Sequence, residues 1–475
     1  MIEEIENKFP VDSIKFSDGT RLWNLVRVFI YANIQNVSNQ KKKKINLKSA
    51  FFILKEGVLP LKLPKRKINV CGFSSTESRK EYKGKFYDIY LDPLYEILGD
   101  NFTVFEWPSI SGRRRKYFGK IYSKNYVKMH IPIFTKTFWN IFFYKLIGHK
   151  NFSIESEEIL LEIIKYISKT SSIDEKSLKK NIYDFLTVFF YVKDLLKKIL
   201  TRISPKVVLI RCGYGRFPMA LSQACRELGI NSVELQHGLI TPSIPPYVKK
   251  VKSGNKDCTP EYLLTHGDVF RDIVKNGNIF EKDKVFSTGH IYLEKIKEEN
   301  KKETATTKST ISDFKHNLLF TSQWILSEEI KEFIIRVADK MKKSNLNLGI
   351  IFKPHPYDKI DYSGLDAHEN IILADKYEDT FKLLKLVDAH STVYSTSGLE
   401  AMAFGKPNIF VDIAGLTKKS NPKFIVKSPE KFIETLQYII YNAEISKQTL
   451  ELANMFFKSE PKKNFKEFFK KIGAI

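Results

Sequence analysis

Short apolar runs alternate with amphipathic segments along most of the chain after residue 205. Runs such as residues 207–210 and 348–352 have the length and composition of buried strands. The segments 217–228 and 328–343 carry apolar side chains at three- and four-residue spacing, which predicts helices. Strands that alternate with helices of this length form parallel sheets. The predicted fold class is therefore α/β.

The predicted elements fall into two regions. In the first region we predict strands at residues 67–71, 207–210, 232–235, 262–265 and 285–287, and helices over 160–167, 181–201 and 217–228. In the second region we predict strands at residues 317–320, 348–352, 371–373, 389–394, 408–411 and 424–426, and helices over 328–343, 379–386, 397–404 and 429–442. Gly229 is expected to end its helix as a C′ glycine.

A polar run without large apolar residues, NKKETATTKST, separates the two regions and is typical of a linker. A chain of 475 residues also exceeds the roughly 100–200 residues of one domain. We therefore predict an N-terminal domain at 1–299 with basic, aromatic helical insertions, a linker at 300–311, a C-terminal domain at 312–455 and a basic C-terminal helix at 456–475. Two parallel sheets joined in this way are expected to face each other across a cleft.

Composition places the chain in the cytoplasm. The four cysteines, at positions 71, 212, 225 and 258, are far apart and lack metal-ligand spacing, as expected of reduced thiols. The acidic start, with Glu3, Glu4 and Glu6, does not fit a secretory signal peptide. No apolar run approaches the ~18 residues of a membrane-spanning helix. We expect a cytoplasmic protein, and its basic charge favours a place at the inner face of the cell membrane.

The net charge of +24 is concentrated in three segments. Residues 41–67 carry ten Lys or Arg and one Glu, residues 113–128 carry seven and no acid, and residues 458–471 carry six Lys and two Glu interleaved with phenylalanines. An anionic membrane, an anionic polymer and nucleic acid are all attracted by such segments. Because no nucleic-acid-binding signature is present, membrane or glycan contact is favoured. The alternative is that the basic segments have no function and only reflect a Lys-rich proteome.

Two loops of the second region combine groups that bind phosphate. Lys353-Pro354-His355-Pro356 directly follows a predicted strand, and its prolines hold the His rigidly. The second loop supplies hydroxyls, backbone N–H groups and a helix start, which attracts anions. Its candidate residues are Ser391, Thr392, Ser395, Thr396, Ser397, Gly398 and Glu400. The alternatives are a structural turn for the first loop and ordinary helix capping for the second.

Further candidates lie at the ends of other predicted strands. Thr321, Ser322 and Gln323 follow the first strand of the second region and are expected to contact the same ligand. In the first region, Gln236-His237-Gly238 ends a strand, and a His there can act as a general base or acid. His290 follows Gly289 at the domain junction and is expected at the cleft. The alternative for both histidines is that they lie in structural turns and make all their hydrogen bonds within the protein.

Together, the Gln-His-Gly loop, the Lys-Pro-His-Pro loop and the run Ser-Thr-Ser-Gly-Leu-Glu-Ala with its later Gly-Lys-Pro resemble a GT-B glycosyltransferase of the capsule polysaccharide and lipopolysaccharide biosynthesis type. That family includes CMP-Kdo-using and sialyl- or polysialyltransferase-like groups. The resemblance covers roughly residues 205–430. It implies two Rossmann-like domains with parallel sheets facing an interdomain cleft. It also implies that His355 and Pro356, with Ser395, Thr396 and Ser397, bind the CMP moiety.

One motif departs from that family. Its members carry an acid-acid-Gly motif in the first domain, whereas the nearest strings here, Ser17-Asp18-Gly19 and Lys55-Glu56-Gly57, have one acid each. The candidate catalytic residues are therefore His237 and Asp18. Lys353, His355 and the hydroxyl loop are expected to hold the departing phosphate without a metal or any other cofactor.

The resemblance implies a glycosyltransferase that moves a sugar from a CMP- or UDP-sugar to a growing surface polysaccharide or glycolipid. The second domain then binds the nucleotide sugar, and the first domain binds the acceptor. Two other functions stay open. One is an alditol-phosphate transferase of the teichoic-acid type, and the other is a UDP-sugar epimerase-like GT-B protein that transfers nothing to a glycan.

Overall fold

The structure is a computed structural model that describes residues 1–36, 63–64, 66–74, 78–107, 121–129, 153–250, 254, 256–300, 314–324, 326–343, 347–356, 358, 360–413 and 424–475. Most of the basic segment 41–67, the arginines of segment 113–128, the Lys55-Glu56-Gly57 string and most of the predicted linker lie outside these residues. Two compact units result. The first contains residues 1–265, 270–288 and 462–475, and the second contains residues 266–269 and 289–461.

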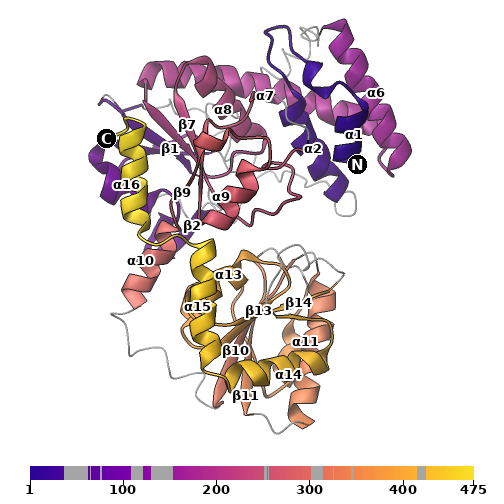
Figure 1. The fold of residues 1–475 in the computed structure, drawn as a ribbon, viewed down its shortest axis with the longest axis vertical. Coiled ribbons are helices and arrows are strands. Elements are labelled where there is room, and N and C mark those ends of the chain that lie inside the picture. Colours follow the sequence, from indigo (N-terminus) through magenta and orange to yellow (C-terminus); the bar gives the residue numbers. More distant parts are fainter. Residues whose placement is uncertain are drawn as a thin grey trace, which may run out of the picture. The chain divides into compact units, whose positions relative to one another are not determined.

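The first unit is built on a seven-stranded sheet in which all paired strands are parallel (Figure 1). The order across the sheet is β5 (Tyr126–Lys128), β4 (Phe102–Glu106), β1 (Val70–Ser74), β6 (Val207–Ile210), β7 (Asn231–Leu235), β8 (Tyr262–Thr265) and β9 (Val285–Ser287). A separate antiparallel hairpin, β2 (Arg79–Tyr82) and β3 (Lys85–Asp88), follows β1. Because the chain runs outward from β1 in one direction and from β6 in the other, the sheet has a topological switch point between these two strands.

Helices surround this sheet. They are α1 (Ile2–Lys8), α2 (Trp23–Asn36), α4 (Tyr95–Leu98), α6 (Ile154–Thr170), α7 (Glu175–Ile203), α8 (Arg216–Glu227), α9 (Asp268–Lys275) and α16 (Pro461–Lys471). The side chain of Asp174 caps the N-terminus of α7 by accepting from the backbone N–H of Ser177. Gly229 follows α8 with φ +66°, as predicted for a C′ glycine.

The basic C-terminal helix, α16, turns its aromatic residues inward. Phe465, Phe468 and Phe469 are buried, and the Phe468 ring lies 5.6 Å from that of Tyr262 on β8. The lysines of α16 stay at the surface. The aromatic residues in this basic segment are therefore core residues of the first unit and do not form an exposed aromatic surface.

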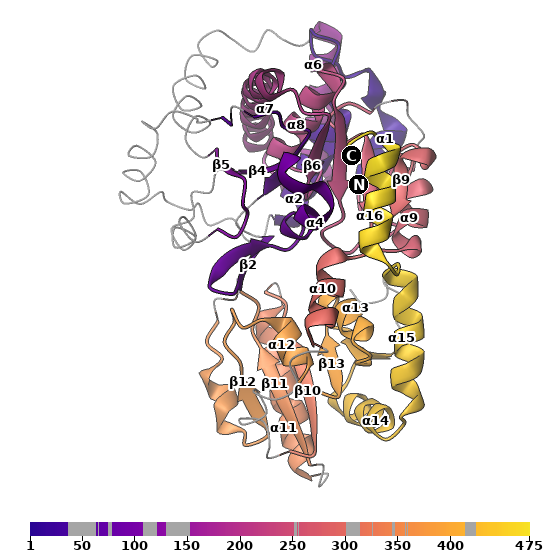
Figure 2. The ribbon, with the colours of Figure 1, turned by 90° about the vertical axis from the view of Figure 1, so that its left-hand side faces the viewer.

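The second unit contains a six-stranded parallel sheet (Figure 2). Its order is β12 (Ile371–Leu373), β11 (Leu348–Lys353), β10 (His316–Thr321), β13 (Ala389–Thr392), β14 (Asn408–Val411) and β15 (Ile425–Val426). Its helices are α10 (Ile291–Asn300), α11 (Ser327–Lys343), α12 (Thr380–Leu384), α13 (Thr396–Ala403), α14 (Pro429–Ile440) and α15 (Glu444–Phe456). The chain leaves β10 toward β11 on one side and continues from β13 toward β14 on the other. The switch point therefore lies between β10 and β13.

The predicted fold class, α/β with two Rossmann-like domains and parallel sheets, is confirmed. The predicted domain boundary lay at 299, whereas contacts divide the chain at 288 and assign α16 to the first unit. That the two sheets face a common cleft stays a prediction. In the part of the chain that the structure describes, no helix combines the length and the apolar character needed to cross a bilayer.

Candidate functional site

The carboxyl ends of β10 and β13 bring a buried set of polar side chains together in the second unit. The hydroxyl of Thr321 lies 2.9 Å from that of Ser397 and 3.1 Å from Nε2 of His390. The other ring nitrogen of His390, Nδ1, lies 2.5 Å from Oδ1 of Asn408. Burial lowers the pKa of His390 to about 4, although the Asn408 contact opposes this, so the imidazole is neutral. This is the switch point at which open α/β sheets bind ligands.

The hydroxyl loop enters α13 at this point. Ser395 is the N-cap residue, and its side chain accepts from the backbone N–H of Ser397 at 3.2 Å. The free N–H groups of the first turn and the helix dipole make this end attractive to an anion. Packing requires a glycine at position 398, because a Cβ on Gly398 would lie 2.8 Å from Nδ2 of Asn408 and 2.9 Å from Cζ of Phe410. The glycine thus lets α13 pack closely on β14.

His355 lies in the neighbouring loop, two residues after the end of β11. Its ring is partly exposed, and its backbone N–H donates to Oδ2 of Asp358 at 2.8 Å. Burial lowers the pKa of His355, Asp358 opposes this and Lys353 lowers the pKa further. Lys353 itself is buried, and its ammonium donates to the carbonyl of Lys376 at 3.2 Å. An anion beside these two groups would favour the protonated imidazole.

Asp358 was not among the residues that the sequence indicated, yet it connects two of the predicted loops. Its carboxylate accepts from the hydroxyls of Ser322 at 2.8 Å and Tyr362 at 3.1 Å, and also from Ser327. It accepts from the His355 N–H as well. The loop after β10 and the loop after β11 are therefore held by one buried carboxylate. The available signal was an acid three residues after His355.

Some predicted donor-binding hydroxyls already have protein partners. Ser391 donates to the carbonyl of Ile409, and Thr392 donates to the carbonyl of Thr321, each at 2.9 Å. These bonds join neighbouring strands. Ser395, Thr396 and Glu400 are partly exposed, whereas Gln323 is buried at the end of β10. That all these residues bind the donor stays a prediction.

In the first unit, three loops meet at His237, just after β7. Its Nε2 lies 3.1 Å from the hydroxyl of Tyr214, and its backbone carbonyl accepts from the hydroxyl of Tyr90 at 3.0 Å. Gln236 fixes the turn by donating to the carbonyl of Gly238 at 2.8 Å. Among the described residues, the buried Nδ1 of His237 has no hydrogen-bond partner.

The electrostatics of His237 favour a neutral imidazole. Burial lowers its pKa to about 3, and the nearby charge of Arg211 acts in the same direction. Beyond the turn, a Cβ on Gly238 would meet no atom within 4 Å, so the space beside it is open. His237 is therefore a fixed, neutral imidazole whose Nδ1 has no partner among the described residues, and a general base must be unprotonated in this way; a pKa this low also makes it a weak proton acceptor.

Asp18 and His290 lie in different surroundings. Burial alone would raise the pKa of Asp18, but hydrogen bonds from Thr20 and the charge of Lys193, 3.2 Å away, lower it below its ordinary value. Nδ1 of His290 accepts from the backbone N–H of Leu293 at 3.2 Å, which caps α10. Asp18 and His237 share no hydrogen-bonding partner among the described residues, and His290 belongs to the second unit.

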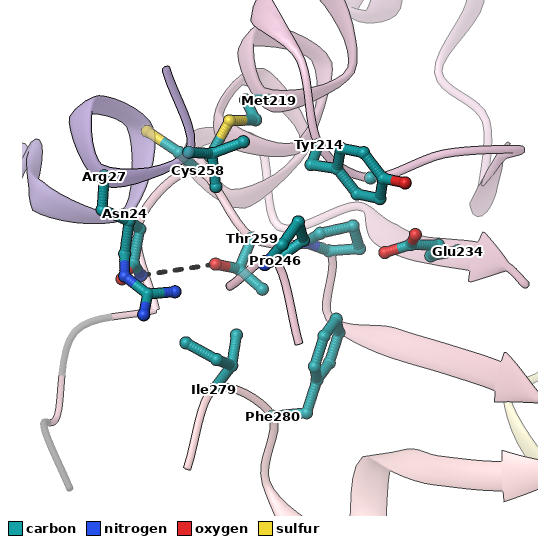
Figure 3. Close-up of a pocket in the computed structure, with 13 residues that line it drawn as sticks. Asn24, Arg27, Tyr214, Met219, Glu234, Pro246, Cys258, Thr259, Ile279 and Phe280 are labelled. Atoms are coloured by element: carbon teal, nitrogen blue, oxygen red, sulfur yellow. Dashed lines mark hydrogen bonds between the residues drawn. The ribbon is translucent and has the colours of Figure 1, made fainter. Parts of the chain in front are cut away.

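Glu234, on β7, is a buried acid that the sequence analysis overlooked. Burial raises its pKa to about 7, although hydrogen bonds from Tyr247 at 2.6 Å and from Gly213 oppose this. A Cβ on Gly213 would lie 2.1 Å from Oε2 of Glu234, so the carboxyl group packs directly under the turn that carries Tyr214. Glu234 and Tyr214 both line a cavity of about 20 Å³, enough for one water molecule (Figure 3). The sequence feature that could have revealed Glu234 is an acidic residue within a largely apolar strand.

No protein-family model and no curated protein sequence matches this chain. Solved structures do match it. MnaA from S. aureus in complex with UDP has a TM-score of 0.55 at 12% identity, covering 86% of this chain and 98% of that one. A putative UDP-N-acetylglucosamine 2-epimerase from Listeria monocytogenes has a TM-score of 0.55 at 13% identity, covering 86% and 97%.

The UDP-GlcNAc 2-epimerase of Neisseria meningitidis bound to UDP-GlcNAc has a TM-score of 0.51 at 14% identity, covering 86% of this chain and 100% of that one. The wall teichoic acid polymerase TagF covers 95% and 98% at 12% identity, but its TM-score of 0.46 supports no conclusion. These likenesses show the fold, which is of the GT-B type. The finer resemblance to Kdo- or sialyltransferase-like groups stays a prediction.

Proposed function

We propose that this protein is a glycosyltransferase of the capsule and lipopolysaccharide biosynthesis type. It would transfer a sugar from a CMP- or UDP-sugar to a hydroxyl of a surface polysaccharide or glycolipid. The observation that carries the proposal is the convergence of three elements at the switch point of the second sheet: the end of β10, the His355 loop and the N-terminus of α13. Together they offer an anion site of the kind a nucleotide phosphate needs.

In this proposal the second unit stabilises the leaving group. The acceptor oxygen forms a bond to the anomeric carbon while the bond from that carbon to the phosphate oxygen breaks. The released nucleotide phosphate gains negative charge on that oxygen. The helix N-terminus, His355 and Lys353 would stabilise this charge electrostatically, in the role that a metal ion plays elsewhere.

The first unit supplies the base. Nδ1 of His237 would take the proton of the acceptor hydroxyl, since Nε2 is already engaged with Tyr214. Asp18 is the second candidate, because its carboxylate is already paired with the ammonium of Lys193, whereas Nδ1 of His237 has no hydrogen-bond partner among the described residues. His290 and the Gln236–Gly238 turn would contact the acceptor.

A second candidate function is an epimerase that acts on a UDP-sugar. It is favoured by the structural neighbours, which include MnaA in complex with UDP, a putative UDP-N-acetylglucosamine 2-epimerase and a UDP-GlcNAc 2-epimerase bound to UDP-GlcNAc. Such an enzyme needs no acceptor. An epimerase would therefore convert the donor when no acceptor is present, whereas a glycosyltransferase would need the acceptor.

The test is a donor screen by mass spectrometry, preceded by thermal shifts with CMP, UDP, GDP and CDP. We expect CMP or UDP to stabilise the protein, and the acceptor to gain the mass of one sugar. Because epimers have equal masses, the donor is also followed by NMR: an epimerised donor formed without an acceptor would support the epimerase. A product that also gains a phosphate would support an alditol-phosphate transferase. If no nucleotide raises the melting temperature and no donor is consumed, the proposal is wrong.

We also propose that the basic segments hold the protein at an anionic membrane surface. The exposed lysines of α16, which include Lys463, Lys466 and Lys470, contribute to this charge. Pelleting with phosphatidylserine-containing vesicles should fall as salt rises from 50 to 300 mM, by about tenfold or more. Equal pelleting with neutral phosphatidylcholine vesicles, or no salt dependence, would contradict this.

A further inference from the structure

Exposed aromatic side chains at the carboxyl edge of the second sheet are a feature that the phosphate site does not explain. In the described part of the second unit, the exposed large apolar residues are Trp324, Tyr377, Ile425, Tyr438, Tyr441, Leu450 and Met455. All but two of them lie on or beside α14, α15 or β15. Trp324 and Tyr377 instead follow the carboxyl ends of β10 and β12, on either side of the His355 loop.

The backbone at Trp324 is held firmly. Ser322 precedes it and Ser327 follows it, and both hydroxyls donate to Asp358. Ser327 also lies 3.0 Å from the carbonyl of Trp324. Since Asp358 accepts from the His355 backbone as well, one carboxylate fixes the position of the indole-bearing loop relative to the phosphate site. These bonds connect the described residues on both sides of Trp324 to the His355 loop.

The indole itself is left open. It is 40% exposed, and within the described residues its ring has no aromatic or cationic partner. Tyr377 differs in this respect, because the ammonium of its neighbour Lys376 lies 5.6 Å from its ring centroid. A flat apolar ring that is exposed on a loop bonded to the anion site suits one ligand class. That class is a phosphate ester carrying a planar heterocycle.

We propose that Trp324 is the stacking platform for the nucleobase of the bound nucleotide. This rests on the proposed nucleotide-binding function and adds to it the residue that recognises the base. Stacking of a base on an aromatic side chain contributes substantially to nucleotide affinity and tolerates any base, since every base has a π-face. Because the residues on both sides of Trp324 are already bonded to Asp358, little backbone entropy is lost when the base stacks.

The experiment measures the affinities of UMP, CMP and ribose 5-phosphate by titration calorimetry. Ribose 5-phosphate keeps the sugar and the phosphate but lacks the base. Trp324→Ala should weaken the binding of UMP or CMP about tenfold and leave the binding of ribose 5-phosphate unchanged. Trp324→Phe should restore affinity to within about threefold, because the phenyl ring still stacks.

Three controls make the result decisive. Tyr441→Ala removes an aromatic residue that is 67% exposed just after α14, and it should not change any affinity. Nucleotide binding should quench the indole fluorescence of the wild type, and Trp324→Phe should lose that part of the quenching while keeping its affinity. Tyr377→Ala tests the competing platform and should have little effect.

The outcomes separate the two proposals. If the wild type binds UMP or CMP and Trp324→Ala binds them equally well, the stacking proposal is overturned while the nucleotide site stands. An equal loss of ribose 5-phosphate binding would likewise overturn it, because the loss would then come from the loop and not from the base. If the wild type binds none of the nucleotides, both proposals fail.

Discussion

The two candidate sites, one in each unit, are built from different kinds of chemical groups. In the second unit, the site is a set of many weak donors: hydroxyls, backbone N–H groups and a helix end, with His355 beside them. In the first unit, the site is a single imidazole, His237, beside the half-buried hydroxyls of Tyr214 and Tyr90. A shared array suits binding a delocalised anion, whereas one fixed nitrogen suits taking one proton. The comparison therefore assigns binding to the second unit and proton transfer to the first.

The sharpest way to break this comparison is to remove the imidazole in the first unit. His237→Ala should lower the rate of sugar transfer by about 10²–10⁴, the range of general base catalysis. Nucleotide affinity, measured by calorimetry, should remain unchanged. A variant that transfers sugar at a near-normal rate, or that loses nucleotide binding, would show that the division of labour is wrong.

The second prediction concerns His355. His355→Ala should lower transfer by about 10²–10³ because a donor to the leaving phosphate is lost, and it should weaken nucleotide binding as well. His368→Ala is the matched control, since His368 lies beside Asp339 outside the site. Circular dichroism should show an intact fold for both variants. Near-normal turnover in His355→Ala would disprove the phosphate-site proposal.

The third prediction concerns the pH dependence of stability and the buried acid Glu234. Its folded-state pKa of about 7 lies above the ordinary value of 4.5, so the folded chain holds this proton more tightly than the unfolded chain. The stabilisation is fully present below about pH 4.5 and is lost as the pH rises to about 7, about 3 kcal/mol in all. The melting temperature of Glu234→Gln, taken relative to that of the wild type, should therefore be higher at pH 8 than at pH 5.

The exposed Glu162 on α6 provides the control for this comparison. Glu162→Gln should shift the melting temperature by the same small amount at both pH values. If Glu234→Gln also shows no pH-dependent difference from the wild type, Glu234 is not a proton-binding group of the folded state in this range.

The smallest expected effect comes from the helix cap in the second unit. Ser395→Ala removes the N-cap hydrogen bond of α13 and should cost about 1 kcal/mol of stability. Ser428→Ala removes the equivalent cap of α14 and should cost a similar amount. Only Ser395→Ala should also weaken nucleotide binding. Equal nucleotide affinities in the two variants would mean that the N-terminus of α13 does not hold the phosphate.

The second site was far easier to predict from the sequence than the first. Most of its predicted residues come in two contiguous motifs that directly follow strands, and residues 348–352 were predicted as a strand where Leu348–Lys353 was found. His390, Asn408 and Asp358 were not indicated by the sequence. In the first unit the Gln236-His237-Gly238 turn and Asp18 were indicated. Tyr214, Tyr90 and Glu234 were not, because each contributes through a partner far away in the sequence. The strands β4 and β5 and the β2–β3 hairpin were missed as well.

The amino-acid sequence by itself determined the parallel α/β architecture, the ends of most strands and the loops that carry phosphate-binding groups. These follow from local periodicity and from the conformational limits of Gly, Pro and helix caps. Only the tertiary structure decided which groups meet. Thr321 reaches Ser397, 76 positions away, because β13 pairs with β10 on the side opposite β11. Strand order in the sheet is set by packing over the whole unit, so local sequence does not reveal it.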